Sequence, residues 1–243
     1  MLTLVIPGYN EASLLSSTVP DAVAALDNTV DHSIHIVDNA STDQTYHVAK
    51  ELAGAHDVVT AQRIEQRGKA RAIRAGWNHA DTPVLAFVDA DLSPDIAALP
   101  SMARRVKTTG GLAITSRHSP TSTITWSTKR RLLSKAYNAA LNLAAGTDVH
   151  DHQCGLKCVH EDFYQRVHPL RSTEWFLDTE LILDAHHESV PIDEYAIRWE
   201  DRDDGELATT SVSTKLLRAL LTYYNENGFS RHGTRVTRHQ RTL

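Results

Sequence analysis

One short apolar run, 84–88, ends directly in the polar triplet Asp89-Ala90-Asp91, and this junction constrains the fold more than any other part of the sequence. The run carries no charge, and Ser93-Pro94 follows the triplet as a typical helix start. A short buried strand that leads through a polar turn into a helix is typical of a parallel α/β sheet. Ligands bind at the carboxyl ends of the strands in such sheets. We therefore expect Asp89 and Asp91 to lie in a ligand-binding site.

The rest of the N-terminal half alternates short apolar runs with helical patterns, which predicts a mostly parallel central sheet flanked by helices. The expected strands are Leu2–Ile6, Ser33–Val37, Val58–Thr60, Val84–Val88 and Leu112–Thr115. The expected helices are 14–26, Thr42–Leu52, Lys69–His79 and Ile96–Val106. Further along, the patterns predict helices over Ser127–Ala145, Glu174–His186 and Thr214–Tyr224, and a strand over Ile192–Trp199.

Composition narrows the class of protein. The 243 residues suffice for one substantial α/β domain, and no repeat or low-complexity linker divides them. A net charge of -5 argues against a nucleic-acid binder, which usually carries a basic excess. Two cysteines cannot form a disulfide framework, so we expect a cytoplasmic protein. No apolar stretch approaches the roughly 20 residues of a membrane span, so we expect no transmembrane segment.

Polar residues gather at three further places that the pattern puts beside strand ends. They are Pro7-Gly8-Tyr9-Asn10-Glu11 after the first strand, 38–43 after the second, and Arg67-Gly68-Lys69 before the third helix. Gly68 would let a phosphate approach the backbone, which favours Lys69 as a phosphate contact over an exposed lysine at a helix start. For Asp38, recognition of a base or ribose and a simple turn before the next helix both stay open. Together the clusters suit a base, a ribose, a diphosphate and a metal.

The paired aspartates of the triplet suit a hard cation. Carboxylate oxygens are preferred ligands of Mg²⁺ and Mn²⁺, which also bridge phosphates. A metal at Asp89 and Asp91 would neutralise a departing diphosphate. The alternative is two solvated turn acids that cap the next helix. The position of the triplet directly after an apolar strand favours the metal site.

These four clusters together resemble those of family 2 glycosyltransferases, which have the Rossmann-like GT-A fold. The similar segments are Ile6–Glu11, Val37–Asp43, Gly68–Gly76 and Phe87–Leu92. The resemblance implies Mg²⁺ or Mn²⁺ on Asp89 and Asp91. It also implies a nucleotide-sugar site formed by Pro7, Tyr9, Glu11, Asp38, Lys69, Asp89, Ala90, Asp91 and Arg202.

The second half of the chain looks like the polyprenyl-phosphate branch of that family, the dolichyl-phosphate mannose and glucose synthases. The similar segments are Ser116-Arg117, Arg130 with Ser134, Asp151–Lys157, Trp175–Glu180 and Arg202–Gly205. This resemblance implies inverting transfer of a hexose from a UDP- or GDP-sugar to dolichyl or polyprenyl phosphate. The residues expected to take part in catalysis are Asp91, Arg117 and Arg130, and those expected at the acceptor phosphate are Arg117, Arg130, Arg131 and Ser134.

Three departures from the branch leave the sugar and the base undecided. Asn39 stands where many relatives have a second Asp, Ser93 replaces a Gln of mannose synthases, and Glu206-Leu207-Ala208 replaces a Ser-Lys pair. We expect one GT-A domain in which 1–115 binds the nucleotide sugar and 116–226 binds the acceptor. Residues 227–243, with four arginines and no acid, form a basic tail.

Alternatives to each part of this interpretation stay open. A hydroxyl acceptor would need a base, and Asp151 or Asp178 would be the residue to test. A nucleotidyltransferase or a non-catalytic sugar-nucleotide sensor fits the sequence less well. Peripheral docking on the cytoplasmic face of a membrane would use the basic tail and the helices over Ser127–Ala145 and Thr214–Tyr224. The alternative is that the helices pack on the sheet and the tail is disordered. The sequence also groups His150, His152, Cys154 and Cys158, and it favours ordinary surface residues over a zinc site.

Overall fold

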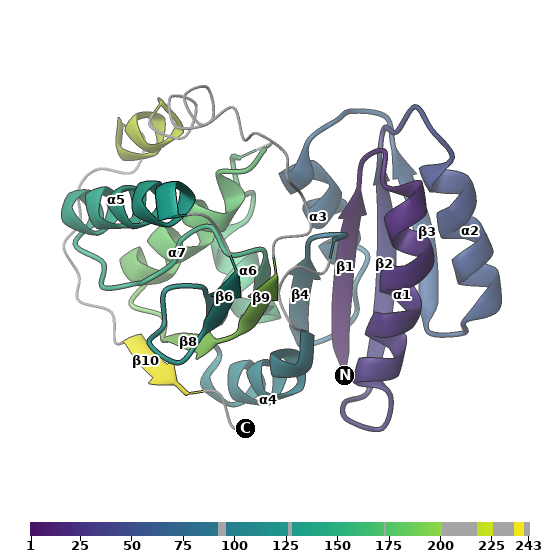
Figure 1. Cartoon of the computed structure of the whole chain (residues 1–243), viewed down its shortest axis with the longest axis horizontal. Helices are drawn as coiled ribbons and strands as arrows, with labels where there is room; N and C mark the ends of the chain where they lie inside the picture. The colour runs from purple at the N-terminus through teal and green to yellow at the C-terminus, as the bar shows by residue number, and fades with distance from the viewer. Residues whose placement is uncertain (92–95, 126–127, 173, 201–217, 226–235, 241–243) are drawn as a thin grey trace.

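The apolar run before Asp89 is strand β4 (Val84–Val88) of an eight-stranded sheet, and all five of its residues are buried. A computed structural model describes residues 1–243 apart from 92–95, 126–127, 173, 201–217, 226–235 and 241–243. The strand order is β10-β8-β5-β7-β4-β1-β2-β3 (Figure 1). The other strands are β1 (Leu2–Gly8), β2 (His32–Asn39), β3 (Val59–Ile64), β5 (Leu112–Ser116), β7 (Leu156–His160), β8 (Ile192–Ala196) and β10 (Val236–His239).

The predicted mostly parallel sheet is confirmed, with one antiparallel strand that the sequence patterns did not predict. β7 runs antiparallel between β4 and β5, whereas β1, β2, β3, β8 and β10 pair in parallel with their neighbours. Strands from both halves of the chain therefore share one sheet. A small second sheet pairs β6 (Thr123–Thr125) with β9 (Arg198–Glu200).

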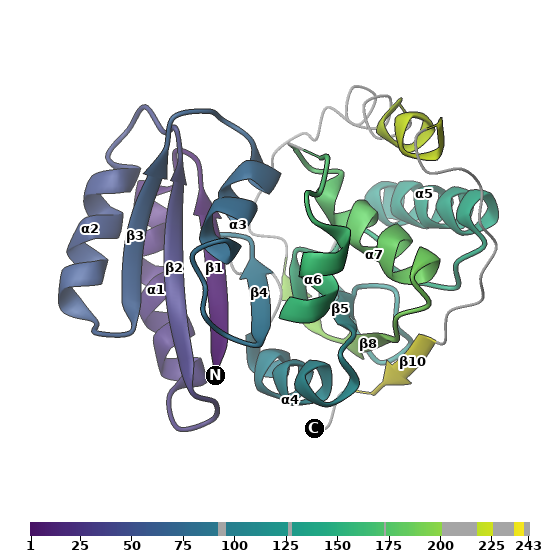
Figure 2. The same ribbon diagram turned by 180° about the vertical axis from the view of Figure 1, so that it is seen from behind.

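Helices cover both faces of the main sheet. They are α1 (Ala12–Leu26), α2 (Thr45–Ala55), α3 (Lys69–Trp77), α4 (Leu99–Thr109), α5 (Thr128–Ala145), α6 (Glu161–Val167) and α7 (Leu177–His187), with a 3-10 turn at Ile96–Ala98. Residues 218–225 are also helical. α1, α2 and α4 pack on one face, and α3, α6 and α7 on the other, as the two views show (Figures 1 and 2).

The alternation of side chains along each strand explains the two layers. In β1, Leu4 and Ile6 join the core under α1, whereas Val5 joins the core under α3. Gly76 lets α3 lie close to the sheet, because a Cβ added there would be 2.5 Å from a methyl group of Val5. Close packing of α3 matters for the site, since this helix begins with Lys69.

The expected strand over Ile192–Trp199 is two strands. Its chain leaves the main sheet at Ile197, whose backbone N–H donates to Ser122 Oγ at 3.0 Å and whose carbonyl accepts from the Thr123 N–H at 3.0 Å. These bonds turn the following residues onto β6. The predicted strand is therefore right for its first part and wrong in its continuity.

The segment 227–243, expected to be a basic tail, contributes an edge strand. β10 pairs in parallel with β8, where His239 lies 2.8 Å from Asp193 Oδ1 and Arg238 Nε lies 3.7 Å from Glu194 Oε2. The expectation of a disordered tail is wrong for residues 236–239. Among the residues that the structure describes, no helix is both long and apolar enough to pass through a membrane.

Candidate functional site

The four polar clusters meet at one edge of the sheet. Gly8 ends β1, Asn39 ends β2, and Asp89 directly follows β4, so these residues lie at the carboxyl ends of three adjacent strands. α3 begins beside them, because the Gly68 N–H donates to Asn39 Oδ1 at 2.7 Å. This edge is the upper one in Figure 1. Parallel strands of alternating β and α elements place ligand sites in this position.

Lys69 is the centre of the site. Its side chain is 8% exposed, and its Nζ lies 2.6 Å from Asp89 Oδ1 and 3.3 Å from Asp178 Oδ2. Burial alone would lower the pKa of Lys69, but the charges of Asp178 and Asp89 overcome burial and raise it. Lys69 is therefore a buried cation, and its interpretation as an exposed lysine at a helix start is wrong.

Asp178 links Lys69 to a second buried lysine. Lys157 Nζ lies 2.6 Å from Asp178 Oδ1 and also donates to the Cys154 carbonyl at 2.8 Å. Burial would raise the pKa of Asp178, but Lys157 and Lys69 overcome that effect and lower it. A chain of alternating charges, Asp89–Lys69–Asp178–Lys157, therefore runs under the carboxyl end of β4. The sequence did not indicate Lys157 as a partner of this site, although it lies in the segment Asp151–Lys157 that resembles the polyprenyl-phosphate branch.

Asp89 is the member of this series of charges that reaches the solvent. Its side chain is 30% exposed, and its backbone N–H donates to the Gly155 carbonyl at 3.1 Å. Burial and the nearby charges of Asp178 and Asp91 raise the pKa of Asp89, while Lys69 opposes them. The concentration of negative charge indicates a place for a cation. In the described part of the chain no three His, Cys, Asp or Glu side chains form a metal cluster, but Mg²⁺ commonly takes one or two carboxylates and completes its shell with substrate phosphates and water. Asp89 and Asp91 fit that donor set.

The end of β2 holds a buried carboxylate with unmet hydrogen-bonding capacity. Asp38 is fully buried, and neither of its carboxylate oxygens has a hydrogen-bond partner. Arg63 Nε is 3.5 Å from Asp38 Oδ2. The alternative interpretation, in which the Asp38 side chain stabilises a turn, is therefore wrong. A buried acceptor of this kind indicates a ligand. Nearby, the guanidinium of Arg67 stacks on the Tyr9 ring with its central carbon 3.7 Å from the centroid.

The remaining residues of the first cluster surround this end of the sheet. Pro7 lies in β1 and is half-buried, and Glu11 immediately precedes α1. The Glu11 N–H donates to Thr45 Oγ1 at 2.8 Å, which ties the β1 loop to α2. Ala90 is buried between the two aspartates. All the expected donor-site residues that the structure describes therefore meet at one sheet edge, while Arg202 and Ser93 lie outside the described residues.

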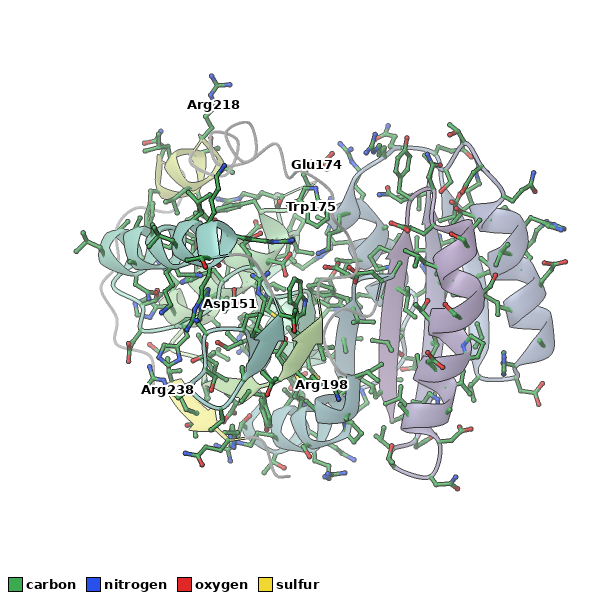
Figure 3. The ribbon with its side chains drawn as sticks, in the orientation of Figure 1. Asp151, Glu174, Trp175, Arg198, Arg218 and Arg238 are labelled. Carbon is green, nitrogen blue, oxygen red and sulfur yellow. The ribbon has the colours of Figure 1, made fainter. Side chains whose placement is uncertain are left out.

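Arg117 has a different environment from the one its sequence context predicted. Its Nε donates to Asp151 Oδ2 at 2.8 Å, one Nη donates to Asp151 Oδ1 at 2.9 Å, and the same Nη reaches the Gln153 carbonyl at 3.0 Å. Asp151 is fully buried, and Figure 3 shows it in the half of the molecule that contains α5. Burial would raise the pKa of Asp151, but Arg117 overcomes burial and holds it well below its usual range. These hydrogen bonds of the Arg117 guanidinium thus go to Asp151 and the Gln153 carbonyl, whereas the sequence predicted a contact with the acceptor phosphate.

The other expected acceptor residues lie on or near α5. Arg130 and Arg117 both approach the face of Trp199, with guanidinium carbons 5.4 and 5.7 Å from the ring centroid. Ser134 Oγ is 2.8 Å from His118 Nε2, and Arg131 is exposed. The structure therefore brings Arg117 and Arg130 together at one aromatic ring. Trp199 was missed from the sequence, because a lone tryptophan at a strand end gives no signal of its partners.

The cluster of His and Cys residues is not a surface group. His152, Cys154 and Cys158 are fully buried, and burial lowers the pKa of His152 to about 3 and raises that of the Cys154 thiol to about 11. Thr115 Oγ1 donates to Cys154 Sγ at 3.0 Å. The prediction of ordinary surface residues is wrong for these three, and they form part of the core beside Lys157.

A separate cavity of about 380 Å³ lies between α6, α7 and the helix at 218–225. It is lined by Arg166, Arg171, Glu180, Asp184 and Tyr223 among others, and it contains no residue of the four clusters. Tyr223 Oη donates to Asp184 Oδ1 at 2.7 Å, and burial raises the pKa of Asp184 to about 7. This bond fastens the 218–225 helix to α7.

Comparison with known proteins adds a family and a shared fold. The sequence profile of glycosyl transferase family 2 matches residues 3–167. Glycosyltransferase AglD of Haloferax volcanii is 27% identical over 209 positions that cover 84% of this chain but 34% of AglD, so the chain spans about a third of that relative. Dolichyl-phosphate beta-glucosyltransferase of Drosophila melanogaster is 30% identical, over 85% of this chain and 69% of that protein. The solved mannosyltransferase PcManGT from Pyrobaculum calidifontis, in complex with GDP-Man and Mn²⁺, has a TM-score of 0.60 at 18% identity and covers 93% of this chain and 63% of its own. The predicted GT-A fold is confirmed.

Proposed function

The chain belongs to glycosyl transferase family 2, and from that premise we propose that it is an inverting hexosyltransferase that moves a sugar from UDP- or GDP-hexose to dolichyl or another polyprenyl phosphate. The Drosophila relative, named for transfer to dolichyl phosphate, supports the acceptor. The Pyrobaculum mannosyltransferase, solved with GDP-Man and Mn²⁺, supports a nucleotide-sugar donor used with a divalent metal.

The choice of a phosphate acceptor rests on one observation. The two carboxylates that could act as a base, Asp151 and Asp178, both form ion pairs with cations. A hydroxyl acceptor needs a base to remove its proton, and that base works best with a pKa near the working pH. Asp151 is paired with Arg117, and Asp178 lies between Lys69 and Lys157. The pKa of each carboxyl is lowered, so neither is suited to take a proton near neutral pH. A phosphate acceptor is already ionised and needs only orientation and charge compensation.

The donor end follows from the buried carboxylates. Asp38, with two unsatisfied oxygens, would accept hydrogen bonds from the base or ribose, and the Tyr9–Arg67 stack beside it offers a flat surface. Asp89 and Asp91 would hold Mg²⁺ or Mn²⁺, and the metal would supply charge neutralisation for the departing diphosphate. Lys69 keeps the Asp89 carboxylate oriented and adds a fixed positive charge at the same end. We also place Arg202 on the nucleotide sugar.

At the acceptor end, Arg130 and Arg131 on α5 would meet the lipid phosphate, with Ser134 one turn along the same helix. Arg117 would help to position Arg130. Its hydrogen bonds to Asp151 fix the Arg117 guanidinium near the Trp199 ring, which Arg130 also faces. Arginine suits phosphate because its guanidinium donates two parallel hydrogen bonds.

The outer face of α5 supports peripheral contact with a membrane. Leu132 and Leu143 are 69% and 88% exposed, Leu133 is also exposed, and Lys129 and Arg131 are exposed near the beginning of the same helix. Apolar side chains beside basic ones are typical of helices that lie in the interface of an anionic membrane. We place the protein on the cytoplasmic face, where such a surface would meet the lipid acceptor.

Vesicle binding tests that surface. The double substitution of Leu132→Glu and Leu143→Glu should reduce cosedimentation with phosphatidylcholine vesicles that contain phosphatidylserine. Thr108→Glu, on the exposed face of α4, introduces the same kind of charge away from α5 and should leave binding unchanged. Equal binding by all three proteins would place membrane contact elsewhere or exclude it.

The main proposal is tested by incubating the protein with labelled UDP-glucose or GDP-mannose, Mn²⁺, and either dolichyl phosphate or a hydroxyl acceptor such as a free glycan. We expect label in the lipid fraction, and its loss in Asp91→Ala or after chelation of the metal. Transfer to the glycan but not to the lipid would favour the hydroxyl-acceptor alternative. Formation of a nucleotide sugar from a sugar phosphate and a nucleoside triphosphate would favour a nucleotidyltransferase.

A further inference from the structure

Trp175 is a large aromatic residue that the fold leaves open beside the charged site. It lies in the turn before α7 and is 53% exposed, whereas the next residue, Phe176, is buried against Tyr223 with ring centroids 6.3 Å apart. Phe176 therefore anchors the turn, whereas the Trp175 ring lies next to the Lys69 ammonium group. Figure 3 shows Trp175 near the upper edge of the molecule, between the half with α5 and the strands β1 to β3. The exposed part of the indole offers an apolar face that a ligand can cover.

The Trp175 ring is next to the phosphate end of the donor site. Lys69 Nζ lies 4.6 Å from the Trp175 ring centroid and 2.6 Å from Asp89 Oδ1. The ring and the expected metal ligand thus both lie within 5 Å of one nitrogen. The same ammonium group is also 5.2 Å from the ring centroid of Phe87.

Lys69 does not need Trp175 for charge balance. Two carboxylates, those of Asp89 and Asp178, already compensate its charge at 2.6 and 3.3 Å. A cation–aromatic contact is weaker than a close pairing with a buried carboxylate, and the indole side of this contact is half exposed. The contact with Lys69 therefore orients the indole more than it stabilises the lysine.

We propose that Trp175 binds the transferred hexose by stacking its indole against the C–H face of the sugar ring. This inference rests on the proposed function and identifies the residue that contacts the sugar in that same donor site. The hexose is bonded directly to the diphosphate, so a diphosphate held near Asp89, Asp91 and Lys69 places the sugar within a few ångströms of these charges. Trp175 is an exposed aromatic side chain that lies in this range of Lys69. Stacking would fix the orientation of the anomeric carbon toward the acceptor.

The test separates binding of the sugar from binding of the nucleotide. Calorimetry with Mn²⁺ measures the affinities of UDP-glucose and UDP, and of GDP-mannose and GDP, for the wild type, Trp175→Phe, Trp175→Leu and Trp175→Ala. In Trp175→Ala the affinity for the nucleotide sugar that the wild type binds should fall roughly tenfold, while the affinity for the free diphosphate stays within about twofold. Trp175→Phe should retain most of the sugar affinity. Trp175→Leu, which keeps an apolar side chain but no aromatic face, should resemble the alanine variant.

Thermal unfolding of each variant should stay close to that of the wild type, because the indole is half exposed and Lys69 keeps its two carboxylate partners. Equal losses of affinity for nucleotide sugar and free nucleotide would overturn the proposal and place Trp175 on the nucleotide or on Lys69. Unchanged sugar affinity with a raised KM for dolichyl phosphate would overturn it in favour of the lipid. A wild-type protein that binds neither nucleotide sugar would refute the proposed function itself, which this design therefore distinguishes from failure at Trp175 alone.

Discussion

Gly155 packs closely against Asp89, and replacing Gly155 with alanine tests the geometry of the site. A Cβ added at Gly155 would lie 2.1 Å from Asp89 Oδ2 and 2.7 Å from its Cγ. The backbone there is not in the left-handed region, since the glycines with positive φ in the described structure are Gly68, Gly110 and Gly146. The expected effect of Gly155→Ala is therefore displacement of the Asp89 carboxylate and not strain of the main chain.

The size of that displacement follows from the contacts. Ordinary carbon–oxygen contacts are roughly 3.4 Å, so Asp89 must move by more than about 1 Å. Asp89 Oδ1 is held 2.6 Å from Lys69, and the Asp89 N–H is bonded to the Gly155 carbonyl, so the movement also disturbs the buried lysine. A misplacement of about 1 Å at a reacting centre costs on the order of 100-fold in rate. Overpacking of a core typically costs about 1–3 kcal/mol of stability.

We expect kcat/KM for transfer to dolichyl phosphate to fall about 100-fold in Gly155→Ala, with a higher Mn²⁺ requirement. The matched control is Gly54→Ala in α2, where an added Cβ meets nothing within 4 Å. That variant should keep full activity and gain up to about 1 kcal/mol of stability, because alanine is the better helix former. Wild-type kcat/KM and metal dependence in a folded Gly155→Ala protein would refute the assignment of Asp89 to the donor site.

Three further changes test the buried charges. Arg117→Ala leaves Asp151 buried without a cation and should lower the free energy of unfolding by about 3–5 kcal/mol in chemical denaturation; a stable variant with only a raised acceptor KM would mean that Arg117 acts mainly on the acceptor. Asp178→Asn leaves two buried lysines short of one negative charge and should both destabilise the protein and weaken nucleotide-sugar binding, whereas unchanged binding would separate the charge chain from the site. Asp184 has a folded pKa raised to about 7, so its contribution to stability is present at pH below about 4 and is lost as the pH rises through 7. Asp184→Asn, compared with the wild type at pH 5 and pH 8, should therefore be relatively more stable at pH 8 by about 1–3 kcal/mol, and no change in this difference would contradict the raised pKa.

The donor edge could be predicted because its information is local. Apolar runs such as Val84–Val88 predict strands, and polar residues directly after them must lie at the strand ends. Asp38, Lys69 and Asp89 therefore converge as expected once the strands are parallel. Nothing beyond the order of elements was needed to place them at one edge.

The interior of the site could not be predicted, because its partners are distant in sequence. Lys69 and Asp178 are 109 positions apart, and their contact depends on α7 packing beside α3. Lys157 reaches Asp178 because β7 inserts antiparallel between β4 and β5. A lysine inside a strand pattern normally indicates a solvent-facing position, and here its ammonium group is buried against a carboxylate instead.

The edge strand β10 shows the same limit at the other end of the sheet. Arg238 and His239 look like parts of a polar tail, and Asp193 and Glu194 look like surface acids of a strand. Each group is costly to bury alone, but pairing compensates the charges and lets β10 add to β8. Composition alone cannot show this, because the pairing joins segments about 45 residues apart whose register only the fold determines.

The balance of charge at the proposed donor site also predicts an order of binding. The carboxylates of Asp89, Asp91 and Asp178 exceed the ammonium groups of Lys69 and Lys157 by one negative charge, and Asp91 acts electrostatically on Asp89. A nucleotide diphosphate sugar brings about two more negative charges, so without a metal it meets repulsion at its phosphates. A divalent cation held by the two aspartates would reverse the sign of the site. We therefore expect the affinity for UDP or GDP to be at least about 100-fold lower in EDTA than in Mn²⁺, which corresponds to about 2.7 kcal/mol. Equal affinity in both buffers would mean that the lysines alone hold the diphosphate.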